Sequence, residues 1–381
     1  MNKKIILIGV VLFLISAIGS YFYFKSKNPV LTVATVALPK PSADGSLAFD
    51  KNLPKTQACP LNGEMYSVQQ QKWWETHEPL GVMIENSTDA RPQSGISYAD
   101  VVYEAVAEGG ITRTLNIYYC QDAPEVGPVR SARVYFMDFL SEYGPYPLYA
   151  HVGGANAAGP ANALGEISNL GWNGYNDLNQ FYIGFPTYWR DYSRQGRTVA
   201  TEHTMYSTTS KLWAVAKTHG ITNLVKGQSW DTNFVPYTFK SDATTFGNVT
   251  NVTVPFWGDP GYVVNWEFDP KTDSYLRING GQKFIDIDTK KPIYAKDVVV
   301  LYMKESHAID GYANNEHLLY QDKGTGNALV FLDGKEITGV WKKASRTGRT
   351  LIYDSNGNEV SFNRGQIWFE IVPTYATVTT N

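Results

Sequence analysis

The chain has 381 residues, of which 43% are hydrophobic and 18% are charged. This composition excludes a disordered or collagen-like protein and allows two domains of ordinary size, each with its own core. The net charge is −3, and all four charges of the first 27 residues are basic, so the remainder is more acidic still. Because nucleic-acid-binding surfaces are clustered and basic, we expect no nucleic-acid partner.

The first segment is dominated by an uncharged run of 20 residues from Ile5 to Phe24. At about 1.5 Å per residue, a helix of this length crosses the roughly 30 Å hydrocarbon layer of a bilayer. A signal peptide would end its apolar core at small residues such as Ala17–Gly19, whereas this run continues to Phe24. We therefore predict a signal-anchor over residues 1–27, with a cytoplasmic stub and one transmembrane helix. The bulk of the chain is then extracytoplasmic.

Residues 28–59 lack a sustained hydrophobic period and are rich in proline. This composition predicts a semi-extended linker. Cys59 ends the segment, and Cys120 is the only other cysteine. In an exported chain, two cysteines are compatible with one disulfide, although two buried thiols would give the same sequence.

A β-hairpin is predicted where Val101–Glu108 and Ile111–Tyr119 flank a Gly-Gly pair. If the strands pair regularly from this turn, Glu104, Glu108 and Arg113 share one mostly apolar face. Buried charges are costly unless they are paired. The three residues are therefore either a salt-bridged patch or part of a ligand site.

Two arginines, Arg130 and Arg133, precede a helix predicted over Val134–Tyr143. Exposed backbone N–H groups and two guanidinium groups would suit an anion such as a carboxylate or phosphate. Pairing with a nearby carboxylate such as Glu108 is the alternative.

Two histidines are further candidates. His151 stands near the end of a predicted strand that is followed by two glycines, and such strand ends often hold ligands in α/β folds. His203 follows a cluster of charged residues. For each of them, a structural role is the alternative.

After about residue 231 the helical period disappears, and Asp333-Gly334 and Asn356-Gly357 separate strand-like runs. We predict an α+β fold class: the N-terminal transmembrane helix, a mixed α/β domain at 60–230, and a β-rich domain at 231–373. Residues 374–381 are expected to be a tail.

The chain lacks the sequence motifs of several common catalytic and cofactor-binding sites. The chain contains no dinucleotide-binding or P-loop pattern and none of the common hydrolase signatures. Its six histidines are scattered and its cysteines lack metal-type spacing. We therefore expect no cofactor and no metal.

Several motifs in order make the chain similar to a known family. They are Val82–Asn86, Ala90–Gly95, Ala99–Glu104, Glu108–Arg113, Gly127–Arg133, His151–Gly154, Gly339–Lys343 and Gly365–Trp368. Together they resemble the YerB family of bacterial lipoprotein-like proteins, which has no known function. The resemblance covers roughly residues 60 to 373 and implies a two-domain extracytoplasmic protein.

Two features depart from the family pattern. Typical members carry a lipobox cysteine, whereas this chain has no cysteine before Cys59. The resemblance then implies that a transmembrane helix replaces the lipid. Similar proteins tend to have Pro-His-Asn where this chain has Glu202-His203-Thr204, which leaves the role of that turn open.

The sequence favours an envelope protein that binds an anionic cell-envelope ligand or partner, such as a peptidoglycan fragment or an envelope protein. The predicted ligand-binding residues are Arg91, Glu104, Glu108, Arg113, Arg130, Arg133, His151 and His203.

One alternative is a glycan-processing enzyme with Glu108, or else Glu104, as its acid. On a regular strand these two carboxylates are about 13 Å apart, beyond the roughly 5 to 9.5 Å that glycosidases use. A nearby arginine also opposes an acid role. Another alternative is a structural adaptor for an envelope complex.

Overall fold

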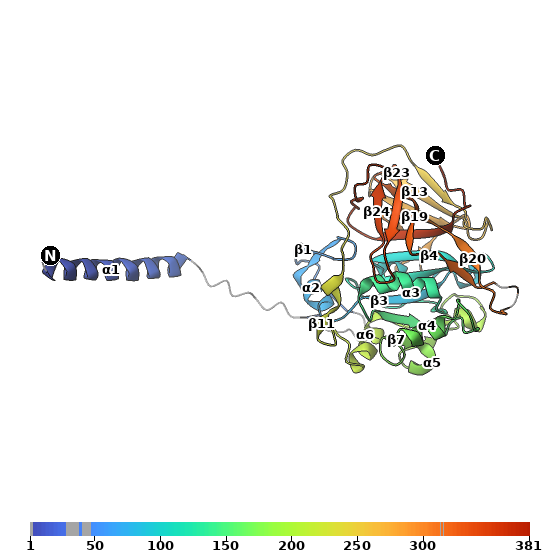
Figure 1. The fold of residues 1–381 in the computed structure, drawn as a ribbon, viewed down its shortest axis with the longest axis horizontal. Helices are drawn as coiled ribbons and strands as arrows, with labels where there is room; N and C mark the ends of the chain where they lie inside the picture. The colour runs from blue at the N-terminus through green and yellow to red at the C-terminus, as the bar shows by residue number, and fades with distance from the viewer. Residues whose placement is uncertain (1–2, 28–37, 40–46, 313, 315) are drawn as a thin grey trace. The chain divides into compact units, whose positions relative to one another are not determined.

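The computed structural model describes residues 3–27, 38–39, 47–312, 314 and 316–381. The chain divides into two compact units, Met1–Ala37 and Leu38–Asn381 (Figure 1). Most of the first half of the predicted linker, residues 28–37 and 40–46, lies outside the described residues.

The described residues of the first unit form a helix, α1 (Lys3–Lys27), over the predicted transmembrane segment. A membrane-spanning helix needs about 20 predominantly apolar residues in succession. Among the described residues, no helix is both long enough and apolar enough to cross a membrane. The prediction of an N-terminal transmembrane anchor is therefore wrong on this finding.

The second unit is built around a ten-stranded sheet to which both predicted domains contribute. Its strands, in spatial order, are β24 (Leu351–Asp354), β23 (Lys335–Lys343), β22 (Gly324–Leu332), β19 (Asp297–Met303), β25 (Ile367–Pro373), β4 (Val101–Glu108), β5 (Ile111–Tyr118), β3 (Leu80–Glu85), β6 (Leu148–His151) and β7 (Asp177–Asn179). The two halves of the chain meet where β25 pairs with β4 in parallel. The described residues form a β-rich fold with few helices, so the prediction of a mixed α/β domain at 60–230 needs correction. The ten-stranded sheet also contains strands from both sides of residue 230, and the domain boundaries stay a prediction.

A second sheet of six strands packs beside the first. Its strands are β15 (Gln282–Lys283), β14 (Ser274–Asn279), β13 (Val264–Asp269), β12 (Asn251–Val254), β26 (Thr379–Thr380) and β18 (Tyr294–Ala295). Five strand pairs form small ribbons: β1 (Lys55–Ala58) with β2 (Met65–Ser67), β8 (Trp189–Arg190) with β9 (Met205–Tyr206), β10 (Leu224–Val225) with β11 (Gln228–Ser229), β16 (Ile285–Asp286) with β17 (Lys291–Pro292), and β20 (Glu305–His307) with β21 (Leu318–Tyr320).

The helices of this unit are short. They are α2 (Val68–Trp74), α3 (Val134–Leu140), α4 (Ala163–Asn169), α5 (Gln180–Ile183) and α6 (Thr209–Thr218). Single 3₁₀ turns are η1 (Thr88–Ala90), η2 (Ile96–Tyr98), η3 (Ser141–Tyr143), η4 (Thr201–His203) and η5 (Trp230–Asn233). The helix predicted from Val134 is confirmed as α3 followed by η3.

The predicted hairpin forms, but its register differs from the regular pairing expected from the turn. Glu108 lies opposite Ile111, whereas Glu104 lies opposite Thr114 because a β-bulge interrupts the ladder between Val106 and Glu108. A bulge adds one residue to one strand and so exchanges the faces of all residues beyond it. Arg113 therefore points away from Glu104, and the predicted set of three residues is split between the two faces of the sheet.

The face that carries Tyr103 packs against α3. The Tyr103 ring stacks between Phe139 of α3 and Phe369 of β25, with both pairs of ring centroids 4.8 Å apart. All three rings are fully buried, so this stack joins the two halves of the chain through apolar contact.

The opposite face carries a buried ion cluster centred on Arg277 of β14. Glu104 and Glu370 are register partners on β4 and β25. Arg277 Nη2 lies 2.6 Å from Glu104 Oε2, and Nη1 lies 3.0 Å from Glu370 Oε1. None of these three side chains is exposed. The guanidinium also lies 4.3 Å from the centroid of the Trp368 ring. The cluster thus ties the second sheet to the first.

We predict that Arg277→Met lowers the free energy of unfolding by about 3 to 5 kcal/mol, because it leaves two neighbouring carboxylates buried without their cation. Chemical denaturation measures this loss. Arg197→Met is the matched control, since Arg197 is exposed and its ion pair with exposed Asp89 is long, at 3.8 Å. If the free energy of unfolding falls equally little in both variants, the Arg277 cluster does not hold the sheets together.

Candidate functional site

A cavity of about 560 Å³ lies at the carboxyl ends of β6 and β7, and we call it the Arg130 cavity. Its lining comes from residues within four separate segments, together with Leu164 and Arg190: 129–131; 152–154 and 156; 179, 181 and 182; and 201, 202 and 205. His203 is not one of the lining residues. Segments of several predicted motifs therefore meet at one hollow.

The segment that carries Arg130 is held between two strands of the sheet. The Arg130 N–H donates to the Met83 carbonyl of β3 at 2.9 Å, and the Val152 N–H after β6 donates to the Arg130 carbonyl at 3.0 Å. Ala132 N–H in turn donates to the Gly153 carbonyl at 2.9 Å. These bonds place Arg130 beside the glycine turn that follows β6.

Arg130 belongs to a three-residue charged group with Glu85 and His203. Arg130 Nε lies 3.3 Å from Glu85 Oε2, and His203 Nδ1 lies 2.8 Å from the same oxygen. The Glu85 side chain is 5% exposed, whereas that of Arg130 is 27% exposed. Burial lowers the pKa of Arg130 and Glu85 raises it. Glu85 therefore anchors a guanidinium that still reaches the cavity.

Arg190 supplies a second cation to the same cavity. It is exposed and donates to the Thr201 carbonyl and, at 3.3 Å, to Thr204 Oγ1. Among the described residues it makes no ion pair with a carboxylate. Its charge lowers the pKa of Arg130, after the larger effects of burial, Glu85 and other neighbours. Two guanidinium groups therefore line the same cavity.

Glu202 provides the negative charge of the lining. Its pKa is lowered mainly by a backbone hydrogen bond, and His203, Arg130 and Arg190 lower it further. The cavity therefore presents two cations and one exposed carboxylate.

Glu108, Arg113 and Arg133 lie behind the cavity and hold its wall. Glu108 forms ion pairs with Arg133 and, at 3.3 Å, with Arg113. Arg113 donates to the Ser131 carbonyl at 2.8 Å, and Arg133 donates to the Ala132 carbonyl at 2.6 Å. Because its carboxylate is shared by two guanidinium groups, Glu108 is poorly suited to donate a proton as a general acid. These three residues position the segment that carries Arg130.

His151 also acts behind the cavity, where it is fully buried. Its Nδ1 lies 2.7 Å from the Gly153 carbonyl and its Nε2 lies 2.7 Å from Asp177 Oδ1. Both ring nitrogens are therefore engaged with oxygen acceptors. His151 fixes the glycine turn rather than facing the cavity.

Arg91 and Glu104, the remaining candidates, lie away from the Arg130 cavity. Arg91 donates to the Asn86 side chain at 3.0 Å and to the Gly261 carbonyl at 2.9 Å. Burial lowers its pKa to about 10. Glu104 accepts from Asn86 at 3.0 Å and belongs to the Arg277 cluster. The structure does not bring these two residues together with Arg130.

Four residues that line the cavity are not among the predicted binding residues: Arg190, Glu202, Phe181 and Tyr182. Arg190 belongs to a short charged stretch with Asp191 and Arg194, which is the only sequence signal that could have indicated it. The two aromatic residues follow no pattern that distinguishes them from core residues.

The structure joins Cys59 and Cys120 by a disulfide, with Cα atoms 6.0 Å apart. The buried carboxyl of Asp100 lies 3.7 Å from Cys59 Sγ. Among the described residues, these three side chains alone have ligand atoms grouped closely enough for a metal. Because the two sulfurs are bonded to each other, they are not available as thiolate ligands in this form.

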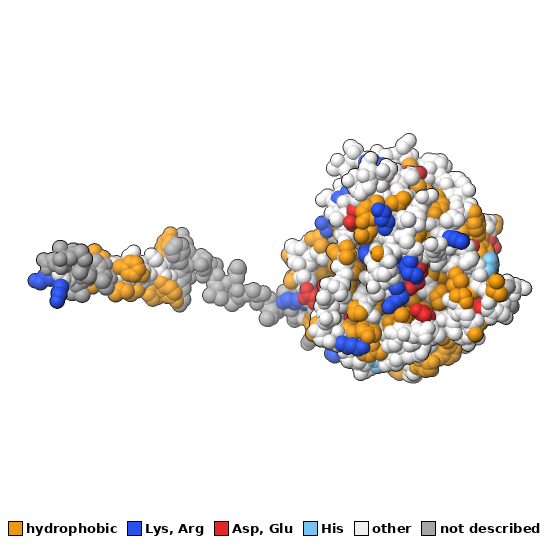
Figure 2. Space-filling model, viewed as in Figure 1, with side chains coloured by type: hydrophobic (Ala, Val, Ile, Leu, Met, Phe, Trp, Pro, Cys, Tyr) orange, Lys and Arg blue, Asp and Glu red, His pale blue; other side chains and the backbone are white. Residues whose placement is uncertain are grey.

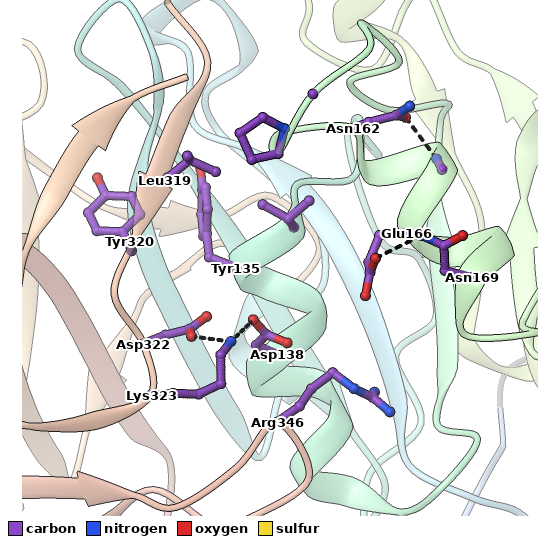
Figure 3. Close-up of a pocket in the computed structure, with 14 residues that line it drawn as sticks. Tyr135, Asp138, Asn162, Glu166, Asn169, Leu319, Tyr320, Asp322, Lys323 and Arg346 are labelled. Atoms are coloured by element: carbon purple, nitrogen blue, oxygen red, sulfur yellow. Dashed lines mark hydrogen bonds and ion pairs between the residues drawn. The ribbon is translucent and has the colours of Figure 1, made fainter. Parts of the chain in front are cut away.

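A second cavity, of about 540 Å³, lies between α3, α4 and the segment after β21, and we call it the Lys323 cavity. Figure 3 shows the Lys323 ammonium between two carboxylates, 2.5 Å from Asp138 Oδ2 and 2.7 Å from Asp322 Oδ1. Arg346 donates to Ser141 at 2.5 Å. Its cations are therefore already engaged by the chain, and we regard the Arg130 cavity as the candidate site.

Both cavities lead to stability tests. We predict that Glu108→Gln lowers the free energy of unfolding by about 2 kcal/mol or more, because Arg113 and Arg133 lose the carboxylate that they share. Denaturant titration measures the loss, and exposed Glu267→Gln is the control. A Glu108→Gln variant as stable as the control would show that these ion pairs do not support the wall, and would reopen a chemical role for Glu108.

Asp322 predicts a pH dependence. Burial, and then Asp138, raise its pKa above the ordinary value of 3.8. The folded state therefore binds the carboxyl proton of Asp322 more tightly than the unfolded state does. The contribution of Asp322 to the free energy of unfolding then falls as the pH rises above about 4. Asp322→Asn removes this titration. We expect the stability of the variant relative to the parent to increase between about pH 4.5 and 7.5. The free energy of unfolding of the exposed Asp242→Asn variant should instead change with pH as that of the parent does. If the curves of both variants run parallel to the curve of the parent, the pH dependence does not come from Asp322.

Known proteins match both the N-terminal and the C-terminal half of the chain. Two models described as the N-terminal and C-terminal domains of a protein of unknown function, DUF3048, match residues 65–222 and 252–369. The chain is 30% identical to "Putative lipoprotein YerB" of Bacillus subtilis (strain 168) over 301 residues, which cover 77% of this chain and 81% of the relative. The crystal structure of YerB protein from Bacillus subtilis aligns with a TM-score of 0.68 and 26% identity, covering 85% of this chain and 100% of that one.

Proposed function

We propose that this chain recognises an anionic ligand of the bacterial cell envelope at the Arg130 cavity. The chain belongs to the DUF3048 family of proteins of unknown function.

The observation that carries the proposal is the pair of guanidinium groups at one cavity. Arg130 is anchored by Glu85 and remains partly exposed, and Arg190 has no carboxylate partner among the described residues. Two like charges that face one hollow repel each other, and an anion between them relieves the repulsion. Guanidinium groups also bind carboxylates and phosphates through two parallel hydrogen bonds.

The wall behind these cations supports a preformed site. Arg113 and Arg133 hold the carbonyls of Ser131 and Ala132, and His151 holds the carbonyl of Gly153. A site whose backbone is already held loses little conformational entropy when it binds. The surrounding charged residues therefore act as positioning groups for the Arg130 segment.

Two observations support an envelope ligand. The relative from Bacillus subtilis carries the name "Putative lipoprotein YerB", and a lipid anchor holds a protein at a membrane surface. A disulfide between Cys59 and Cys120 is typical of proteins outside the reducing cytosol. Together they favour an extracytoplasmic, membrane-associated protein that meets its ligand in the envelope.

We predict that inorganic phosphate, added to the full chain at constant ionic strength, shifts the NMR signals of the Arg130 and Arg190 side chains. Arg130→Gln should weaken phosphate binding by about tenfold or more, because a hydrogen bond to a charged group contributes about 1.5 to 3 kcal/mol. Arg190→Gln should weaken it similarly while leaving the unfolding midpoint unchanged, since Arg190 is exposed.

Arg346→Gln in the Lys323 cavity is the matched control, and it should bind phosphate like the parent. Glu202→Gln should tighten binding, because it removes the only exposed carboxylate of the lining. If phosphate binds equally well to the folded Arg190→Gln variant, or if neither phosphate nor a carboxylate-bearing ligand binds to the parent, the anion-binding proposal fails.

A further inference from the structure

Three aromatic side chains beside the Arg130 cavity lie almost free in solvent. Phe181, Tyr182 and Phe185 are 71%, 77% and 83% exposed, and the first two line the cavity. Figure 2 shows hydrophobic side chains at the surface in the region where Figure 1 labels α5. Clustered exposed apolar groups of this kind mark interaction sites in soluble proteins. We call Phe181 and Tyr182 the aromatic shelf.

The shelf is held in place by the same turn that forms the cavity. Asn179 Oδ1 accepts the N–H groups of Gly153 and Phe181, each at 3.2 Å. Gly153 has φ +58°, and a Cβ atom there would lie 2.9 Å from the Phe181 ring. Position 153 therefore needs glycine for two reasons, its backbone conformation and the close approach of the ring. The exposure of the shelf is thus a feature of a fixed local structure.

The chemistry of the cavity combines flat apolar faces with charged donors and with acceptors. Aromatic rings offer faces on which the C–H side of a sugar ring packs. Arg130 and Arg190 offer donors for a carboxylate, and Glu202 and Asn156 offer oxygen acceptors for hydroxyl groups. A small inorganic anion would use only the arginines. A hydroxyl-rich acidic sugar would use all three kinds of group.

We propose that the ligand of the Arg130 cavity is an acidic polysaccharide, one of whose rings packs on Phe181 and Tyr182 while its carboxylate binds Arg130 and Arg190. This inference rests on the proposed function and names the ligand class for that site. A nucleic acid would also stack on aromatic rings, but the chain carries 36 acidic against 33 basic residues and offers no extended basic surface in its composition.

The test compares four probes on the full chain by calorimetry. Two are acidic glycans: galacturonate oligosaccharides, and peptide-free glycan strands of peptidoglycan, in which every second sugar carries a lactyl carboxylate. The others are the methyl-esterified galacturonate oligosaccharides, which are uncharged, and inorganic phosphate. We expect at least one acidic glycan to bind more than tenfold more tightly than phosphate. The esterified form should bind more than tenfold more weakly than its acidic parent.

Variants separate the shelf from the arginines. Phe181→Ala combined with Tyr182→Ala should weaken binding of the acidic glycan by about tenfold or more and leave phosphate affinity within twofold. Tyr375→Ala is the control, because Tyr375 is 68% exposed and does not line the cavity. Arg190→Gln should weaken the binding of the acidic glycan and of phosphate.

Each outcome decides between the two proposals. Phosphate binding without glycan binding, or glycan binding that does not change in the shelf variant, overturns the polysaccharide inference and leaves anion recognition standing. If neither the acidic glycans nor phosphate bind, the proposed function itself is overturned. Shelf-dependent binding to vesicles of anionic phospholipid, without glycan binding, would overturn the inference in favour of a lipid surface.

Discussion

The fold depends on the compensation of two neighbouring buried carboxylates. Glu104 and Glu370 come from strands that are far apart in sequence, yet they are register partners in the centre of the ten-stranded sheet. Burial, and then the neighbouring Glu104, raise the pKa of Glu370. Arg277 reaches in from the second sheet and bonds to both. Because neither carboxylate is tolerable there without a cation, the junction of the two sheets is specified by charge as well as by apolar packing.

The bulge in β4 assigns the charged residues of the hairpin to two different tasks. On one face, Glu104 joins the Arg277 cluster and links the sheets. On the other, Glu108 and Arg113 face the segment that ends in Arg133 and hold the wall of the Arg130 cavity. One added residue thus separates the charge cluster that joins the sheets from the ion pairs behind the Arg130 cavity, since the alternation of side chains along a strand has a period of two.

The local elements were the most predictable part. The Gly-Gly hairpin, the helix that starts at Val134 and the Asp333-Gly334 turn between β22 and β23 all form where local patterns predict them. Turn residues and side-chain periodicity act on neighbouring residues, so they can be recognised in the chain itself. The candidate site was predictable only in part: Arg130 lines the cavity, Glu108, Arg113, Arg133 and His151 support it from behind, and Arg91 and Glu104 lie elsewhere.

The sequence by itself determined the family, many of the strands and turns, and the arginine- and glutamate-rich motifs. Each of these depends on residues that are close together in the chain. Only the tertiary structure decided which charges meet. Arg277 and Glu104 are 173 residues apart, and the cavity joins Arg130 to Arg190 and to the aromatic shelf across several elements. The bulge, the parallel pairing of β25 with β4 and the exposure of Phe181 and Tyr182 follow from packing between distant segments. No local pattern encodes that packing, because its free energy comes from contacts that exist only in the folded chain.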